Sequence, residues 1–98
     1  MLVEKLTIRK IGEVKDGVSE TTGRAWATRN ILLGFEDETG ESYITAAVDN
    51  QVWQRLGYAE GQTVGLHLRF RTKRLGGGFV FTEVRILDPM LIANRQNA

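Results

Sequence analysis

Apolar residues recur at every second position in several stretches of the chain, which is the period of a β-strand with one buried face. The pattern is clearest on either side of a glycine-rich turn at residues 75–78, where the alternating apolar residues are Val64, Leu66, Leu68, Phe70, Val80, Val84 and Ile86. We therefore predict two long strands joined as a hairpin, with these side chains facing a core. The opposite face of the hairpin then carries cations and aromatic rings, namely Arg69, Arg71, Lys73, Phe79, Phe81 and Arg85.

A first strand is predicted over residues 2–14. Leu6 and Ile8 are two positions apart, but Ile11 and Val14 are out of phase with them. This change of phase predicts a bulge or coil between Ile8 and Ile11, which lets one strand serve two edges of a sheet. Residues 15–23 are polar and bounded by glycine, so we expect a loop there.

Two further strands are predicted over residues 24–35 and 41–48. A hairpin turn at 36–40 joins them, because Glu-Asp-Glu-Thr-Gly places a glycine where a left-handed backbone is expected. By alternation, the side chains expected to face inward are Ile31, Leu33, Phe35, Ile44, Ala46 and Val48. Those expected to face outward are Trp26, Thr28, Asn30, Tyr43 and Thr45.

One helix is predicted between the third and fourth strands. Asp49 can cap its first turn, and Gly57 ends it. Val52 and Leu56 are four residues apart on one helical face, with Trp53 beside them. We interpret Trp53 as a bulky plug for the end of a small barrel rather than as a ligand contact.

The predicted order is three strands, one short helix and two strands. This is the order of an all-β, five-stranded Greek-key OB-fold barrel, whose binding surface lies on its second and third strands and the flanking loops. Residues 1–89 form the predicted domain, and residues 90–98 a short tail.

The composition agrees with one small domain. A chain of 98 residues buries about 60–70% of the surface that it exposes when unfolded, which is enough for one modest core. There are no cysteines, so the fold depends on neither disulfides nor thiolate-rich zinc sites. The sequence shows no signal peptide and no apolar run long enough to span a bilayer, so we expect a cytoplasmic protein without membrane contact.

The net charge of +1 hides an uneven distribution. Glu36, Asp37, Glu38 and Glu41 cluster around one predicted turn. Residues 69–74 instead hold four cations with no acid between them. Local positive potential is what binding to phosphate groups requires, so the small overall charge does not exclude nucleic acid.

Aromatic rings and cations that share one surface are typical of grooves for single-stranded nucleic acid. The candidate contact residues are Arg24, Trp26, Thr28, Tyr43, Arg69, Arg71, Lys73, Arg74, Phe79 and Phe81. Trp26 either forms a stacking platform or packs over a loop, and Tyr43 either stacks on a base or pairs across strands. The exposure of Phe79 and Phe81 depends on register, because one bulge near the glycines would turn both rings into the core.

No pattern for catalysis, a metal or a cofactor is recognisable. His67 is the only histidine, and no cysteine or acid lies at ligand spacing from it. The glycines at 76–78 precede no predicted helix, so they indicate a flexible hairpin tip rather than a phosphate-binding loop. We therefore expect a non-enzymatic protein with no catalytic residues, no metal site and no cofactor.

Three short stretches, 22–26 (Thr-Gly-Arg-Ala-Trp), 66–73 and 84–89 (Val-Arg-Ile-Leu-Asp-Pro), carry a resemblance to a known family. Over residues 3–89 the order of strands resembles the OB-fold single-stranded-DNA-binding proteins of bacteria, their primosomal relatives and, more distantly, those of filamentous phage. In such families a glycine-cation-aromatic run opens the second strand, and long loops embrace the DNA.

The resemblance implies that Arg24 and Trp26 lie in the groove and that Arg71, Lys73 and Arg74 lie in an arm beside it. One feature departs from the family. The chain ends in residues 94–98 (Asn-Arg-Gln-Asn-Ala), without the acidic tip by which the bacterial housekeeping proteins recruit partners. We therefore expect an accessory protein of plasmid or phage type rather than a replisome hub.

The sequence thus predicts binding of single-stranded DNA with low sequence specificity, in an accessory role in replication, recombination or repair. RNA stays open as the ligand, because stacking accepts any base. We expect a homo-oligomer, a dimer or a tetramer, because a small barrel with an open edge strand invites pairing with a copy. The alternative is a protein–protein interaction module that uses the same aromatic face, since interfaces also enrich Trp, Tyr and Arg.

Overall fold

The computed structural model describes the backbone of residues 1–96 and the side chains of residues 1–93. Its strands are β1 (Leu2–Ile11), β2 (Lys15–Val18), β3 (Ala25–Asp37), β4 (Gly40–Asp49), β5 (Thr63–Arg74) and β6 (Val80–Ile86). Its helices are α1 (Asn50–Leu56), the 3-10 turn η1 (Gly76–Gly78) and α2 (Pro89–Gln96). The predicted mostly-β composition is confirmed, and so is the position of α1 between the third and fourth predicted strands.

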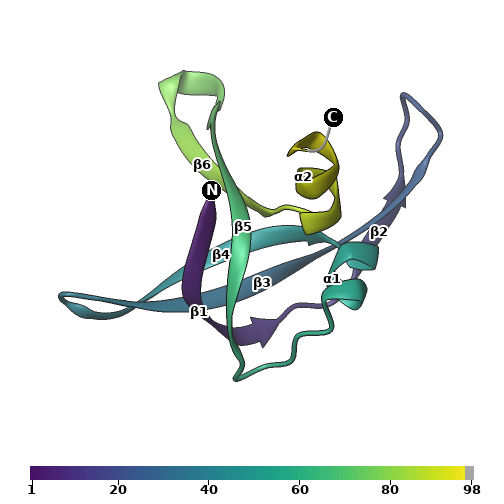
Figure 1. Cartoon of the computed structure of the whole chain (residues 1–98). Coiled ribbons are helices and arrows are strands. Elements are labelled where there is room, and N and C mark those ends of the chain that lie inside the picture. Colours follow the sequence, from purple (N-terminus) through teal and green to yellow (C-terminus); the bar gives the residue numbers. More distant parts are fainter. Residues whose placement is uncertain (97–98) are drawn as a thin grey trace.

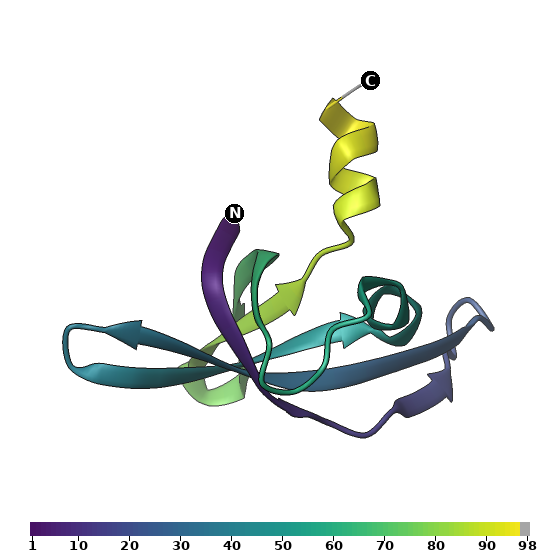
Figure 2. The ribbon, with the colours of Figure 1, turned by 60° about the horizontal axis from the view of Figure 1, so that its bottom comes forward.

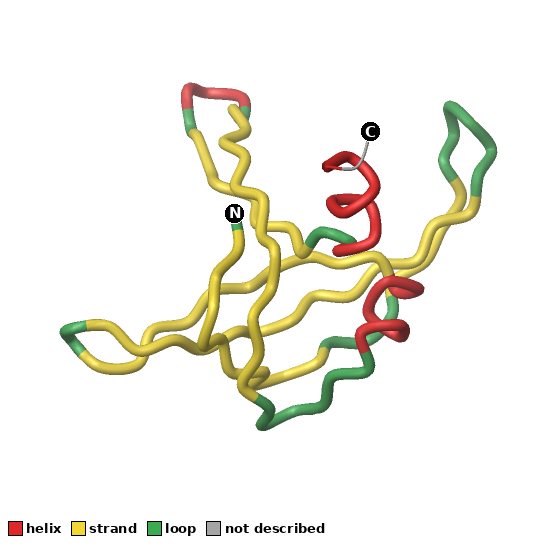
Figure 3. Tube along the Cα trace, viewed as in Figure 1, coloured by secondary structure: helices red, strands yellow, loops and turns green. Residues whose placement is uncertain are grey.

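Five of the strands form a closed ring (Figures 1 and 3). The strand order in the sheet is β1-β5-β6-β4-β3-β2, and an additional pairing of β1 with β3 closes the ring. Only one residue pair, Ala47 with Arg85, joins β4 to β6, and this contact is parallel. The other pairings are antiparallel, and each contains at least four residue pairs. The β4–β6 junction is therefore the weakest pairing in the ring.

Strand β1 serves two partners, as its phase slip predicts. Leu2–Thr7 pairs with β5, and Thr7–Ile11 pairs with β3. The register against β3 shifts between Ile8 and Lys10, where the bulge was expected. A second shift, between Val3 and Leu6, was not predicted, and Lys5 adopts a φ of 60° there. These two irregularities bend one strand across both edges that close the ring.

The core fills the inside of this ring. Its buried residues are Leu6, Ile8, Ile31, Leu33, Ala46, Val48, Trp53, Leu66, Leu68, Val84 and Ile86. Trp53 is 5% exposed and packs edge-on against Tyr58, with ring centroids 6.2 Å apart, so the predicted plug is confirmed. It is held there by α1, whose N-cap Asp49 accepts hydrogen bonds from the Gln51 and Val52 N–H groups.

The C-terminal end of α1 is also as predicted. Gly57 has a left-handed backbone with a φ of 69°, and its N–H donates to the Trp53 carbonyl. A residue with a Cβ is strained in this conformation, which explains the glycine.

The inward-facing row of the β5–β6 hairpin ends earlier than predicted. Phe70 and Val80 were expected in the core, but both are exposed. The reason is that β1 pairs with β5 only as far as His67, and β4 pairs with β6 only at Arg85. Beyond Phe70 the hairpin projects from the ring, as the green segment in Figure 1 shows, so its inner face is exposed.

One further expectation needs correction, and one helix was not predicted. The predicted loop at 15–23 contains a sixth strand, β2, which pairs with β3 over Lys15–Val18. The predicted tail contains α2, which rises from the end of β6 in Figure 2. Asp88 accepts a hydrogen bond from the Met90 N–H at 3.0 Å, and Pro89 stands at the first helical position, so the local start signal was present. Residues 97–98 of the predicted tail lie outside the described residues.

Candidate nucleic-acid interface

The outer face of β3, β4, β6 and β5 is the sheet surface that points away from the core. Its register aligns Asn30 with Ala47, Ala47 with Arg85, and Arg85 with Arg69, which makes one row across four strands. The neighbours of these residues along each strand include core residues of the ring. Since side chains alternate along a strand, the row faces solvent. Because the Ala47 side chain is small, the side chains of the row project least from the sheet where β4 meets β6.

Trp26 lies on this face at the free end of β3 and is 45% exposed, as expected for an outward-facing residue. Its cross-strand partner is Gly17 of β2. A Cβ at Gly17 would lie 2.6 Å from the indole Cζ2, so the ring lies directly against the glycine backbone. The ring therefore packs on β2 and still presents surface to solvent, and stacking of a base on that surface stays a prediction.

The β2–β3 loop holds Arg24 at its end. The Ser19 N–H donates to the Arg24 carbonyl, and the Gly23 N–H donates to the Ser19 carbonyl, both at 2.8 Å. These bonds shape the turn and leave the Arg24 side chain exposed. Thr28, further along β3, is half-buried and lies between Lys15 and Asp49 in register. Arg24, Trp26 and Thr28 are thus brought to one end of β3.

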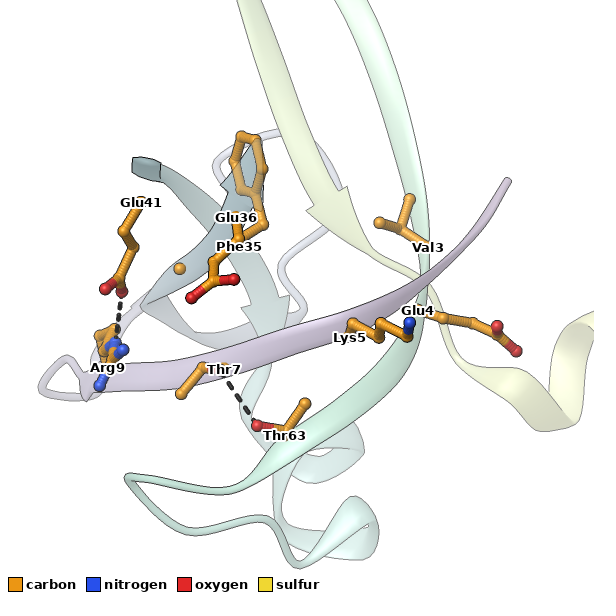
Figure 4. A pocket seen from close by; sticks show the side chains of 10 residues that line it. Val3, Glu4, Lys5, Thr7, Arg9, Phe35, Glu36, Glu41 and Thr63 are labelled. Atoms are coloured by element: carbon orange, nitrogen blue, oxygen red, sulfur yellow. Dashed lines mark hydrogen bonds and ion pairs between the residues drawn. The ribbon is translucent and has the colours of Figure 1, made fainter. Parts of the chain in front are cut away.

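Tyr43 lies further along the outer face and is also exposed. It stands opposite Gly34 of β3. Above Gly34, the Arg9 Nε donates to Glu41 Oε1 at 2.6 Å, and the two side chains point toward one another in Figure 4. This bond, together with the charge of Glu41, raises the pKa of Arg9. Arg9 was not predicted to approach this face.

A cavity of about 540 Å³ opens beside this ion pair (Figure 4). It lies between β1, β3 and the start of β5, where the hydroxyls of Thr7 and Thr63 are 3.1 Å apart. Its charged lining mixes Lys5 and Arg9 with several glutamates, so it offers no potential of a single sign. We therefore place the candidate interface on the outer face and not in this cavity.

The outer face of the β5–β6 hairpin carries the predicted cations in a row. Register places Arg85, Glu83 and Phe81 opposite Arg69, Arg71 and Lys73 respectively. Among the side chains of residues 1–93, neither Arg69 nor Arg71 forms an ion pair. The cations of residues 69–74 have no acid between them along the chain, but an acid lies beside them on the other strand.

That acid is Glu83, whose Oε2 accepts from the Lys73 Nζ at 2.5 Å. The hydrogen bond from Lys73 is the main cause that lowers the pKa of Glu83, and the charges of Arg85 and Arg69 act in the same direction. Lys73 is therefore engaged within the chain, whereas Arg69 and Arg71 form no ion pair with the described side chains. Sequence alternation missed this pair because it depends on the register between two strands.

The tip of the hairpin presents the remaining candidates. Phe79 follows η1 and is 72% exposed, and Phe81 is exposed on the same face as Lys73. Arg74 pairs with Val80 and so lies on the opposite face, with Phe70. Both phenylalanines are therefore exposed, and no bulge turns them into the core. Arg74 is not brought together with the row of Arg69 and Arg71.

Other chemistry is not apparent in the part of the chain that the structure describes. His67 is half-buried on β5 opposite Leu2. Within that part, no group of three or more His, Cys, Asp or Glu side chains is placed to hold a metal ion. None of the described helices is long and apolar enough to cross a membrane.

Two residues of the interface were missing from the sequence-based candidates. Arg85 was assigned to the outer face by alternation but not to the site, although it completes the row with Arg69. Asn30 was treated in the same way and lies at the other end of that row. A signal existed in both cases, because each residue continues the outward phase of a strand that already held a candidate.

Comparison with known proteins adds no assignment. The chain matches no protein-family model, and a search of curated proteins returns no significant match.

Proposed function

We propose that the protein is an OB-fold domain that binds single-stranded DNA without catalysis and with low sequence specificity. The observation that carries the proposal is the outer face, where exposed aromatic rings share one surface with arginines that form no ion pair among the side chains of residues 1–93. The rings are Trp26, Tyr43 and Phe81, and the arginines are Arg69, Arg71 and Arg85. Grooves for single strands combine these two features.

The arrangement of strands supports the same proposal. The ring of five strands with α1 between β4 and β5 has the order of an OB-fold Greek-key barrel. In that fold the ligand crosses the second and third barrel strands, which correspond here to β3 and β4. The β2–β3 ribbon and the β5–β6 hairpin then flank the groove, and they carry Arg24 and Arg71.

Each part of the surface has a separate energetic role. Stacking of a base on Trp26, Tyr43, Phe79 or Phe81 contributes about 1–3 kcal/mol per base and is tolerant of sequence. Each phosphate that an arginine neutralises releases counterions, so the logarithm of affinity falls with the logarithm of salt with a slope of about −0.7 per contact. The proposed complex is therefore weakly sequence-specific and sensitive to salt.

We also propose a homo-oligomer. Strand β2 pairs with β3 on one side, and its other edge has no partner strand among residues 1–96. An open edge of this kind pairs readily with a copy of the chain. A dimer would extend the short track that one ring offers to a DNA strand.

The test is a fluorescence anisotropy titration with labelled oligo-dT between about 50 and 200 mM salt. We expect tight binding at low salt that weakens steeply as salt rises. The chain has two tryptophans, Trp26 exposed and Trp53 buried, so bound oligo-dT is expected to quench Trp26 fluorescence. Trp26→Phe should remove most of the quenching. Absence of salt-sensitive binding at low ionic strength would refute the proposal.

A protein-interaction module is the second candidate. The observation that favours it is the apolar tip of the β5–β6 hairpin, where Leu75, Phe79 and Val80 are all exposed. The double variant Arg71→Glu, Lys73→Glu separates the two functions, because it removes the Arg71 contact and places negative charge beside the arginine row, which should repel phosphate and abolish DNA binding. An apolar contact between proteins should survive that change.

A further inference from the structure

A cavity of about 380 Å³ lies where α2 meets α1 and the bases of β5 and β6. Its volume falls within roughly 300–1,000 Å³, the range of sites for small ligands. The lining includes the side chains of Arg69 and Arg85, together with the apolar Val52, Leu91 and Ile92. This lining suits a ligand with two parts. The two guanidinium groups can bind an anionic group, and the apolar side chains can contact a flat, weakly polar ring.

The two arginines are directly opposite one another in the β5–β6 register. Like charges at opposed positions of an antiparallel pair destabilise the sheet unless an anion neutralises them. Neither arginine forms an ion pair with the side chains of residues 1–93. The nearest acid on the hairpin, Glu83, is engaged by Lys73. The pair therefore favours an external anion.

The two carboxylates in the lining are already occupied. Asp49 Oδ1 accepts from the Gln51 and Val52 N–H groups at 2.9 and 3.4 Å. Asp88 accepts from Arg55 at 2.6 Å through Oδ2, and from the first turn of α2 through Oδ1. Both are engaged in holding the helices in place, and neither makes a hydrogen bond to the arginine pair.

The cavity is continuous with the outer face. Arg85 follows Ala47 in the row that starts at Asn30, so a strand of DNA that crosses β3 and β4 arrives at this point. Phosphodiester and base are the anion and the flat ring that such a strand supplies. A nucleic acid therefore fits the position of the cavity better than an acidic peptide does.

We propose that this cavity is a subsite for one nucleotide of the bound strand, with α2 as its outer wall. Arg69 and Arg85 hold the phosphate, and Leu91 and Ile92 contact the sugar and base. The inference rests on the proposed binding of single-stranded DNA and adds α2 to the interface.

A matched pair of α2 variants tests the apolar half of the subsite. Leu91 and Met90 are 60% and 62% exposed, but only Leu91 lines the cavity. In anisotropy titrations with oligo-dT, we expect Leu91→Ser to weaken binding by about fivefold, which is a typical effect of one lost apolar contact. The salt slope should not change. Met90→Ser should bind as the wild type does.

Arg85 variants test the phosphate half. Arg85→Gln should reduce the magnitude of the salt slope by about 0.7, the effect of one contact to a single strand. Arg85→Lys should restore most of the slope, because it retains the charge. Thermal melts of all variants by circular dichroism verify that each one is folded.

The outcomes distinguish the subsite from the overall function. If the wild type fails to bind oligo-dT, the proposed function itself is wrong. If the wild type binds but Leu91→Ser equals Met90→Ser, and Arg85→Gln keeps the wild-type slope, the subsite alone is refuted. It is also refuted if a labelled phosphoserine peptide binds the wild type and is lost in Leu91→Ser and Arg85→Gln while oligo-dT binding is unchanged.

Discussion

The β3–β4 and β5–β6 hairpins both extend from the ring, but they carry opposite charges. Residues 35–42 hold four acids and no cation, a net charge of −4. Residues 69–86 hold five cations and one acid, a net charge of +4. Each hairpin also contains a pair of like charges at opposed positions, Glu36 with Glu41 and Arg69 with Arg85.

The hairpins differ in how these charges are satisfied. On the acidic hairpin, Arg9 binds Glu41, and Asp37 accepts from the Thr39 N–H, the Thr39 hydroxyl and the Ser42 hydroxyl. On the basic hairpin, the side chains of residues 1–93 form a single ion pair, Lys73 with Glu83. The acidic hairpin thus uses its charge to form its own turn, whereas the basic one leaves its arginines available to a ligand.

The largest expected effect comes from reversing these charges. Arg69→Glu with Arg71→Glu should weaken oligo-dT binding by about 100-fold or more, because each charged hydrogen bond contributes about 1.5–3 kcal/mol. Glu36→Lys with Glu38→Lys is the matched change on the acidic hairpin and should strengthen binding by less than about tenfold. Anisotropy titrations at one salt concentration measure both. Equal and opposite effects would show that only the total charge of the protein matters. The basic hairpin would then have no special role in DNA binding.

Aromatic truncation on each hairpin should have an intermediate effect. Phe81→Ala and Tyr43→Ala should each weaken oligo-dT binding by about fivefold or more, because a stacked base contributes about 1–3 kcal/mol. The salt slope should stay constant, since no charge is lost. Tyr43→Phe serves as the control and should bind normally. Normal binding by Tyr43→Ala would instead place the groove entirely on the side of the basic hairpin.

Removal of the one acid on the basic hairpin should have a smaller effect of opposite sign. Glu83→Gln releases Lys73, so oligo-dT binding should become about two- to fivefold tighter, with a salt slope steeper by about 0.7. Titrations over a range of salt concentrations measure both quantities. An unchanged slope would mean that Lys73 contacts no phosphate, even when it is free.

The smallest effect is expected at the acidic turn. Hydrogen bonds from the Thr39 and Ser42 side chains lower the pKa of Asp37 below its ordinary value of 3.8. Since the folded-state pKa is the lower one, the carboxylate stabilises the fold above pH 3.8 and loses this effect as the pH falls through the folded-state pKa. Asp37→Asn should therefore lower the Tm slightly at neutral pH, and the difference from the wild type should shrink in acid. Oligo-dT binding should not change.

Much of the fold was predictable because local patterns and tertiary packing agree in the ring. The alternation of Leu66 with Leu68 and of Ile31 with Leu33 predicted core positions correctly, and Asp49 and Gly57 delimited the helix. The phase slip after Ile8 predicted a strand shared by two edges. These features depend on side-chain period and on backbone conformation, which are local properties.

The sequence-based predictions were wrong where strands extend beyond the ring. Phe70 and Val80 keep the inward phase of their strands but are exposed, and β2 forms from a polar stretch because β3 extends past the ring. For the candidate site, the exposure of Trp26 and Tyr43 followed from phase, whereas that of Phe79 and Phe81 depended on the register of the last strand. The capture of Lys73 by Glu83 did not, because it requires the register between two strands.

The amino-acid sequence by itself determined which side chains share a face of each strand, where α1 begins and ends, and how charge divides between the two hairpins. Only the tertiary structure decided which of those faces are covered, which cations are neutralised, and that α2 stands beside Arg69 and Arg85. The physical reason is range. Period, capping and turn conformation act over a few residues, whereas burial and ion pairing depend on segments that the closure of the ring brings together.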